Sequence, residues 1–276
     1  MNQNYSVLMS VYKKEKPEYL QMAIESMLKQ TIPPNDFVLV CDGPLTRELD
    51  SVILTVRDQY PSLFQVIRLS QNSGLGNALN IGLKACKNEL VARMDSDDLS
   101  LPYRCELQLN AFKKEPELVF CSGNIAEFTT DDKEILTIRH VPSDYKEILK
   151  YAKRRNPMNH MAVMFKKSMV ETVGGYIEIN LAEDYYLWVR LLKNGYRAAN
   201  LNKILVKVRI GNGMYKRRGG IKYVKSIYRL EKKLLLLHFI SFPEFIINCT
   251  IRITSSLMPV SFRKQLYERR LRKYIC

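Results

Sequence analysis

The amino-acid sequence predicts an α/β fold with a mostly parallel central sheet, flanking helices and an amphipathic helical extension at the C-terminal end. Short apolar runs rich in β-forming residues alternate with segments whose apolar residues recur at helical spacing. This alternation is typical of a parallel sheet covered by helices on both faces. From Ile221 onward it gives way to long amphipathic segments. We therefore expect an α/β domain over residues 1–218 and a basic helical extension over residues 219–276.

The expected elements follow one another in chain order. Strands are predicted at residues 5–11, 36–41, 65–69, 90–94, 118–121 and 161–165. Helices are predicted at residues 17–30, 48–60, 77–86, 103–114, 167–173 and 184–194. Gly195 suits the end of the last helix, because glycine readily adopts the left-handed conformation that terminates many helices.

The positive charge of the chain is concentrated near its end. The formal net charge is +15 over 276 residues, and the segment from Lys207 to Cys276 holds 17 Lys or Arg against 3 Glu. The remainder of the chain is therefore almost neutral. A basic segment of this kind favours phosphate-rich partners, which include anionic lipid headgroups, diphosphates and nucleic acids.

The amphipathic segments after Ile221 predict helices that lie on a membrane surface without crossing it. A spanning helix needs about 20 mostly apolar residues, and Pro243, Glu244, Arg252 and Pro259 interrupt this stretch. The alternative is a helical cap that packs on the α/β domain with its basic face in solvent.

Cysteine usage and the N-terminal segment both favour the cytoplasm. The six cysteines form no CxxC pair, so we expect reduced structural thiols. The first apolar run is expected to be a strand of the fold and not a secretory signal. We therefore expect a cytoplasmic protein that is peripheral on the inner face of the cell membrane.

Four residues directly after the fourth predicted strand carry the clearest chemical signal. They are Asp95, Ser96, Asp97 and Asp98, and carboxylates at alternate positions of a turn can approach one hard cation. Oxygen ligands suit Mg²⁺ or Mn²⁺. Such an ion can also offset the charge of a nucleotide diphosphate and stabilise it as a leaving group. The alternative is a solvated acidic turn.

Six segments, in order, carry a resemblance to a known family. They are Ser6-Val-Leu-Met-Ser-Val-Tyr12, Gln30-Thr31, Asp42-Gly43, Asn72-Ser-Gly-Leu-Gly-Asn-Ala-Leu-Asn80, Asp95-Ser-Asp97, and Glu183-Asp184 with Trp188. Over roughly residues 5 to 218 the chain resembles the family 2 glycosyltransferases, which have the GT-A nucleotide-sugar-binding fold. The resemblance implies an inverting, metal-dependent hexosyltransferase.

By this resemblance, one group of residues binds the donor. Val11 and Tyr12 would line the nucleotide pocket, and Asp42 would accept a hydrogen bond from the base, which favours a UDP-sugar. Asp42 is otherwise read as a turn former before Gly43. The same resemblance assigns further donor contacts to Asn72, Gly74, Asn77, Ser96, Arg217 and Arg218. A dinucleotide-binding fingerprint around Gly74 is incomplete, since its third glycine is missing.

The resemblance also assigns the catalytic and acceptor residues. Asp184 would be the general base, with Glu183 beside it, and His160 and Trp188 would lie near the acceptor. The alternatives are that Glu183 and Asp184 only place negative charge at a helix start, and that His160 is structural. Many relatives carry a histidine in the loop before Arg217 where this chain has Ile210-Gly-Asn-Gly213, so a further metal ligand from that loop is not expected.

These features predict transfer of glucose or galactose from a UDP-sugar to a polyprenyl-diphosphate-linked saccharide during synthesis of a surface polysaccharide such as O-antigen, capsule or exopolysaccharide. Two other functional classes are alternatives. A non-catalytic nucleotide-sugar-binding or membrane scaffold would tolerate loss of Asp184. A nucleic-acid-binding protein would show binding that falls steeply with salt, but the neutral body of the chain disfavours it.

Overall fold

The computed structural model describes residues 4–211 and 219–258 and the backbone of residues 273–274. The first half contains β1 (Ser6–Val11), α1 (Pro17–Leu28), β2 (Asp36–Cys41), α2 (Arg47–Gln59), β3 (Phe64–Arg68), α3 (Leu75–Ala85), β4 (Leu90–Met94), β5 (Leu99–Ser100) and α4 (Arg104–Lys114). The second half contains β6 (Leu118–Phe128), β7 (Thr137–Arg139), α5 (Tyr145–Ala152), the 3₁₀ turn η1 (His160–Ala162), β8 (Met164–Lys166), α6 (Lys167–Thr172), α7 (Glu183–Lys193) and β9 (Arg197–Arg209). Helices α9 (Ile221–Leu236) and α10 (Phe242–Leu257) and the short strand β10 (Lys273–Tyr274) follow.

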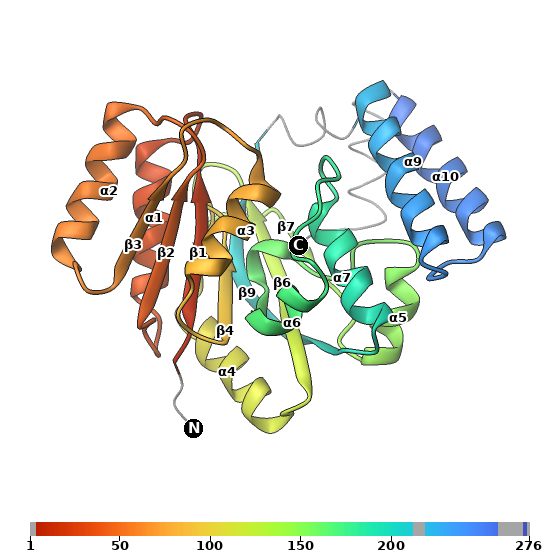
Figure 1. Ribbon diagram of the computed structural model, residues 1–276, viewed down its shortest axis with the longest axis horizontal. Coiled ribbons are helices and arrows are strands. Elements are labelled where there is room, and N and C mark those ends of the chain that lie inside the picture. Colours follow the sequence, from red (N-terminus) through yellow and green to blue (C-terminus); the bar gives the residue numbers. More distant parts are fainter. Residues whose placement is uncertain (1–3, 212–218, 259–272, 275–276) are drawn as a thin grey trace.

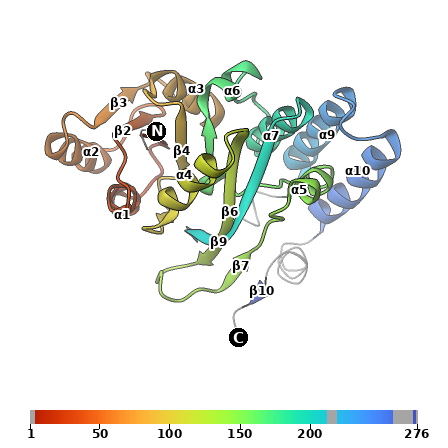
Figure 2. The same cartoon turned by 90° about the horizontal axis from the view of Figure 1, so that it is seen from below.

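The described strands form one curled sheet (Figures 1 and 2). Its order is β10-β7-β6-β8-β4-β1-β2-β3, and β9 pairs with β6 and β5. Strands β1 to β4 are parallel, as predicted, whereas β8 runs antiparallel to both β4 and β6. Helices α1 and α4 cover one face and α3 and α6 the other (Figure 2).

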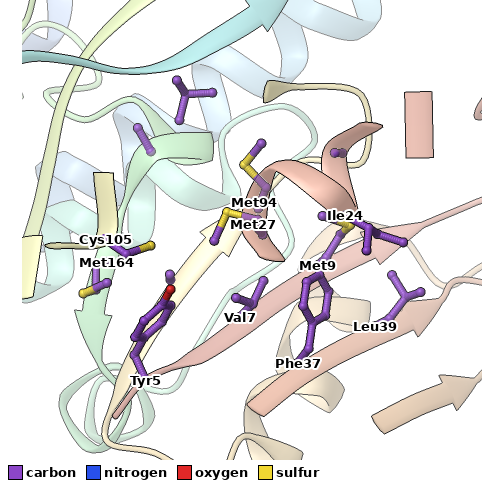
Figure 3. Close-up of a cluster of buried hydrophobic side chains, with 14 of the residues drawn as sticks. Tyr5, Val7, Met9, Ile24, Met27, Phe37, Leu39, Met94, Cys105 and Met164 are labelled. Carbon is purple, nitrogen blue, oxygen red and sulfur yellow. The ribbon is translucent and has the colours of Figure 1, made fainter. Parts of the chain in front are cut away.

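Alternate residues of β1 enter two separate cores. Val7 and Met9 pack with α1 on one face of the sheet, and Leu8 packs with α3 on the other. Figure 3 shows the first core, in which Met9 and Phe37 of neighbouring strands lie beside Ile24 of α1. A strand buried on both faces has to be apolar along its whole length, which explains the continuous apolar runs in the sequence.

The register of the parallel strands determines where the site lies. Val11 is paired with Cys41 of β2, and Met9 is paired with Met94 of β4. The carboxyl ends of these three strands therefore meet at one edge of the sheet, which is where ligands bind in open α/β folds.

Three expectations about the second half need correction. The strand predicted at residues 161–165 is wrong in its first half, because the backbone N–H of Val163 donates to the carbonyl oxygen of His160 and closes the η1 turn. The strand itself is Met164–Lys166. The strand predicted at residues 118–121 is the start of the much longer β6. Helix α5 and the full length of β9 were not predicted.

Helices α9 and α10 pack on α7 at one end of the molecule (Figure 1). Leu230 and Leu234 of α9 lie in one apolar cluster with Tyr185 and Val189 of α7. A capping box of Ser241 and Glu244 begins α10. The division at residue 218 stays a prediction, but the extension shares a core with the α/β domain. Within the described residues, no helix combines the length and the apolar content required to cross a bilayer.

The cysteines of the described residues agree with the expectation of reduced thiols. Cys41, Cys86, Cys105, Cys121 and Cys249 are buried and unbridged. Cys276 lies outside the described residues.

The packing of α3 on the sheet yields a stability prediction. A Cβ atom at Gly82 would lie 2.5 Å from Cδ1 of Leu8 and 2.6 Å from Cγ2 of Val40. We expect Gly82→Val to lower the free energy of unfolding by about 1–3 kcal/mol through overpacking, measured by urea denaturation. Lys84→Val is the control, because it places the same residue on the exposed side of α3. Equal effects of the two substitutions would contradict the proposed close contact.

Candidate active site

Three neighbouring strands deliver polar residues to the same edge of the sheet. Tyr12 follows β1, Asp42 follows β2 and Asp95 follows β4. Val11 is buried, whereas the Tyr12 side chain is 40% exposed. This grouping of strand ends agrees with the sequence prediction.

Asp42 organises the loop that leads into α3. Its Oδ1 accepts a hydrogen bond from the backbone N–H of Ser73 at 2.7 Å, and its Oδ2 accepts from Asn72 Nδ2 at 2.9 Å and from the backbone N–H of Gly74 at 3.1 Å. Gly74 has φ 88° and begins α3, a backbone conformation that glycine adopts without strain. The side chains of Asn72 and Asn77 are exposed at this rim.

The acidic residues after β4 form a compact cluster. Carboxylate oxygens of Asp95, Asp97 and Asp98 lie within 4.8 Å of one another. Burial and the neighbouring charge of Asp95 raise the pKa of Asp97 to about 7. Asp95 and Asp97 are partly exposed, whereas Asp98 is buried and its Oδ1 accepts from the backbone N–H of Arg209 at 2.8 Å. Ser96 is held by Glu15, whose Oε2 accepts from Ser96 Oγ at 2.7 Å.

These oxygen atoms fit a hard divalent cation. Burial, and after it the charges of Asp95 and Glu15, raise the pKa of Asp97, and a bound cation would favour the ionised carboxylates. Asp95 and Asp97 are the partly exposed carboxylates of the cluster and Asp98 is the buried one, and the expected role of Asp95 and Asp97 as metal ligands stays a prediction. Mg²⁺ and Mn²⁺ both prefer such oxygen ligands.

A buried arginine connects this cluster to the second group of acidic residues. Arg93 lies in β4 with 1% of its surface exposed and forms an ion pair with Asp95. Its charge also acts on Asp184, and with burial it contributes to the lowered pKa of His160. Arg93 therefore places Asp95 and Asp184 in one electrostatic environment although they are far apart along the chain.

Asp184 and Glu183 begin helix α7. Asn156 Nδ2 donates to Asp184 Oδ2 at 2.6 Å. Burial raises the pKa of Asp184. Three groups oppose this rise: the backbone N–H of Tyr185, the side-chain amide of Asn156 and the charge of Arg93. Burial and the charge of Asp184 raise the pKa of Glu183 to about 7. A carboxylate with a raised pKa is a better proton acceptor than an ordinary surface carboxylate.

The first turn of helix α3 lies next to Glu183. A Cβ atom at Gly76 would lie 3.7 Å from Cβ of Glu183. Asn80 of α3 and the backbone of Tyr176 form two hydrogen bonds of 2.7 Å each. The starts of α3 and α7 therefore lie close together.

His160 and Trp188 occupy the interior behind Asp184. His160 Nε2 lies 3.0 Å from the hydroxyl of Tyr176, and burial keeps the imidazole neutral by lowering its pKa. Trp188 is fully buried, with its ring centroid 5.3 Å from that of Phe120 and 6.0 Å from that of His160. Trp188 thus supports His160 from the core, and the expected acceptor role of both residues stays a prediction.

A cavity of about 510 Å³ opens beside Asp184. Its lining comes from the loop after α5, the start of α7, and helices α9 and α10, and it includes His160 and Asp184. The cavity is large enough for part of a saccharide acceptor.

Several residues of the site were not anticipated from the sequence. Arg93 could have been noticed, because it interrupts the apolar run of β4 two residues before Asp95. Asn156, Tyr176 and Glu15 carry no comparable signal, since only the folded chain brings them to the site. Arg217 and Arg218, the expected phosphate contacts, lie outside the described residues.

Comparison with known proteins decides the family. The model of the family described as "Glycosyl transferase family 2" matches residues 6–172. The chain belongs to this glycosyltransferase family. It is 40% identical to the UDP-Gal:alpha-D-GlcNAc-diphosphoundecaprenol beta-1,3-galactosyltransferase of Escherichia coli, with 98% of each chain covered. It is 39% identical to the amylovoran biosynthesis glycosyltransferase AmsE of Erwinia amylovora, over 96% of this chain and 98% of that one.

Solved structures confirm the predicted fold class of this family 2 enzyme. The crystal structure of residues 1–349 of Staphylococcus aureus TarS in complex with UDP-GlcNAc superimposes with a TM-score of 0.67, at 19% identity, over 97% of this chain and 76% of that chain. The sheet and helices of the α/β domain are therefore those of the GT-A glycosyltransferases. The family model ends before α7, so Asp184 lies beyond the matched segment.

The bond between Asn156 and Asp184 yields a pH prediction. The amide N–H groups stabilise ionised Asp184 and lower its pKa, so Asn156→Ala raises that pKa. We expect the acidic limb of kcat/KM to move to higher pH by about one unit, because ionised Asp184 is lost at a higher pH. The pH profile of sugar transfer measures this. Asn202→Ala, at an exposed position, is the control. An unchanged limb, or a limb at lower pH, would argue against Asp184 as the base.

Proposed function

We propose that this enzyme transfers a hexose, galactose or glucose, from a UDP-sugar to a lipid-linked saccharide with inversion at the anomeric carbon, in the synthesis of a surface polysaccharide. The observation that carries the proposal is the cluster of Asp95, Asp97 and Asp98, whose carboxylate oxygens lie within 4.8 Å of one another and could hold a divalent cation. Buried Arg93, which pairs with Asp95, also lowers the pKa of Asp184, the candidate base, which supports a common site. The Escherichia coli relative is named for transfer from UDP-galactose to a diphosphoundecaprenol-linked GlcNAc.

The proposed reaction is a single displacement. An acceptor hydroxyl attacks the anomeric carbon from the face opposite the diphosphate, and Asp184 takes the hydroxyl proton. The bond between the anomeric carbon and the diphosphate oxygen breaks, and UDP leaves with the electron pair. Mn²⁺ or Mg²⁺ held by Asp95 and Asp97 would offset the negative charge of the departing diphosphate. Glu183 orients the acceptor beside the base.

The donor is assigned to the edge of the sheet. Val11 and Tyr12 flank the uracil, and Asp42 accepts from its N3–H while it holds the Asn72–Gly74 loop. Asn72, Gly74, Asn77 and Ser96 are assigned to the ribose and diphosphate. Arg217 and Arg218 are assigned to the diphosphate by resemblance alone.

The divalent cation and the base are tested together by three substitutions. Asp184→Asn should reduce kcat by about 10²- to 10⁴-fold while UDP still binds, because only proton transfer is lost. Asp97→Asn should weaken Mn²⁺ binding, which electron paramagnetic resonance measures. It should also slow sugar transfer. Asp58→Asn, which is exposed on α2 and pairs with Arg57, is the control. Full activity of Asp184→Asn with every UDP-hexose tested would refute the proposal.

Membrane attachment is assigned to helices α9 and α10. Ile246 is 47% and Leu257 is 62% exposed on α10, and Lys225, Arg229 and Lys232 are exposed on α9. Apolar side chains next to basic ones favour an anionic bilayer surface. These side chains support peripheral attachment to the cytoplasmic face of the membrane, where a polyprenyl-linked acceptor would be accessible.

We expect the double variant Ile246→Asn, Leu257→Asn to bind anionic vesicles at least tenfold more weakly, because each substitution removes apolar area that would enter the bilayer. Vesicle co-sedimentation measures this. Leu54→Asn is the control, since Leu54 is 41% exposed on α2 at the opposite end of the molecule (Figure 1). Unchanged vesicle binding would show that the exposed apolar side chains do not enter the membrane.

A further inference from the structure

The cavity beside Asp184 has walls of different chemistry. The start of α7 contributes Asp184, the loop after α5 contributes Arg154 and Arg155, and helices α9 and α10 contribute apolar side chains. The apolar lining residues of these two helices are Ile227, Leu230, Ile247 and Ile251. A single cavity therefore combines a candidate base, cations and apolar surface.

Two of the four described arginines that line the cavity are engaged by other groups of the protein. The described lining residues include four arginines, Arg139, Arg154, Arg155 and Arg252, and one carboxylate, that of Asp184. Arg252 forms an ion pair with buried Glu231 at 2.7 Å, and Arg139 donates to the carbonyl oxygen of Asn156 at 3.0 Å.

Arg154 and Arg155 are the cations that remain. Among the described residues, neither takes part in any of the ion pairs, which engage other side chains. Arg154 is exposed and Arg155 partly exposed, so both can reach a ligand in the cavity. Guanidinium groups bind phosphate oxygens through paired N–H donors. Arg154 and Arg155 both line this cavity, and two guanidinium groups can together bind the two phosphoryl groups of a diphosphate.

The apolar wall indicates what is attached to that diphosphate. Ile247 is 54% and Ile251 is 58% exposed, and both line the cavity from α10. The nucleoside and the leaving diphosphate of the donor are assigned to the edge of the sheet, and none of the described residues assigned to them lines this cavity. A diphosphate that joins a saccharide to a hydrocarbon chain would use all three kinds of lining residue: the base, the cations and the apolar side chains.

We propose that Arg154 and Arg155 form the binding site for the diphosphate of the acceptor lipid, with the first isoprenoid units on Ile247 and Ile251 of α10. The saccharide then extends toward Asp184. This inference rests on the proposed function, because it requires a lipid-linked acceptor. It assigns Arg154 and Arg155 to substrate binding and leaves the chemical step to Asp184.

The test uses the full chain and the double variant Arg154→Gln, Arg155→Gln. With a synthetic polyprenyl-diphosphate-linked GlcNAc as acceptor, we expect the acceptor KM to rise about 10- to 100-fold, with kcat and UDP affinity within threefold of wild type. With the matching monophosphate acceptor, the variant and wild type should differ much less. Arg57→Gln, on α2 and paired with Asp58, is the matched control.

Other outcomes would overturn the inference. An unchanged acceptor KM would do so. A parallel loss of UDP affinity would assign the arginines to the donor. An equal rise in KM for the diphosphate and the monophosphate acceptor would show that the arginines do not bind the diphosphate specifically. A loss of anionic vesicle binding with an unchanged acceptor KM would make them a membrane patch.

A binding assay separates this inference from the proposed function. Farnesyl diphosphate, which carries a diphosphate and an isoprenoid chain but no sugar, is titrated against wild type and the double variant by calorimetry. If wild type shows no transfer but binds this probe more tightly than the double variant, the proposed function fails and the diphosphate site stands. If both proteins bind the probe equally, the diphosphate site is refuted whatever the transfer assay shows.

Discussion

The buried guanidinium group of Arg93 is the charge on which the organisation of the site depends. A cation inside a protein is strongly unfavourable unless anionic groups lie near it. Arg93 is 1% exposed, is paired with Asp95, and acts on Asp184 through its charge. The same buried cation therefore pairs with the acidic cluster that follows β4 and lowers the pKa of Asp184, the candidate base at the start of α7.

In contrast to buried Arg93, which has an anionic partner, the acidic cluster and the start of α7 each bring several negative charges close together. Asp97 and Glu183 each have a pKa raised to about 7, chiefly by burial and then by a neighbouring carboxylate. An ionised carboxylate in such a place lowers the stability of the fold. A bound cation or a transferred proton removes this unfavourable charge, and such carboxylates are therefore typical of functional sites. The two groups thus match two separate needs of sugar transfer, a metal site and a base.

The C-terminal helices form part of the wall of the cavity beside Asp184. The same helix α7 that begins with Asp184 packs through Tyr185 and Val189 on Leu230 and Leu234 of α9. The two alternatives for the extension were a helical cap on the α/β domain and helices on a membrane surface. The inner face of the extension packs on the α/β domain, as a cap would, and its outer face exposes the apolar and basic side chains that a membrane-surface helix needs. The residues proposed for the donor in the described structure come from the first part of the chain, and the residues that line the cavity lie between Arg139 and Ser256.

The sequence by itself determined the parallel strands β1 to β4, the strand ends that carry Tyr12, Asp42 and Asp95, and the family, because buried strands and tight turns leave local patterns. Only the tertiary structure decided that Asn156 holds Asp184, that Trp188 lies in the core behind His160, and that Arg154 and Arg155 face the cavity beside Asp184. These relations join segments far apart along the chain, and no local periodicity records which side chains will meet after folding.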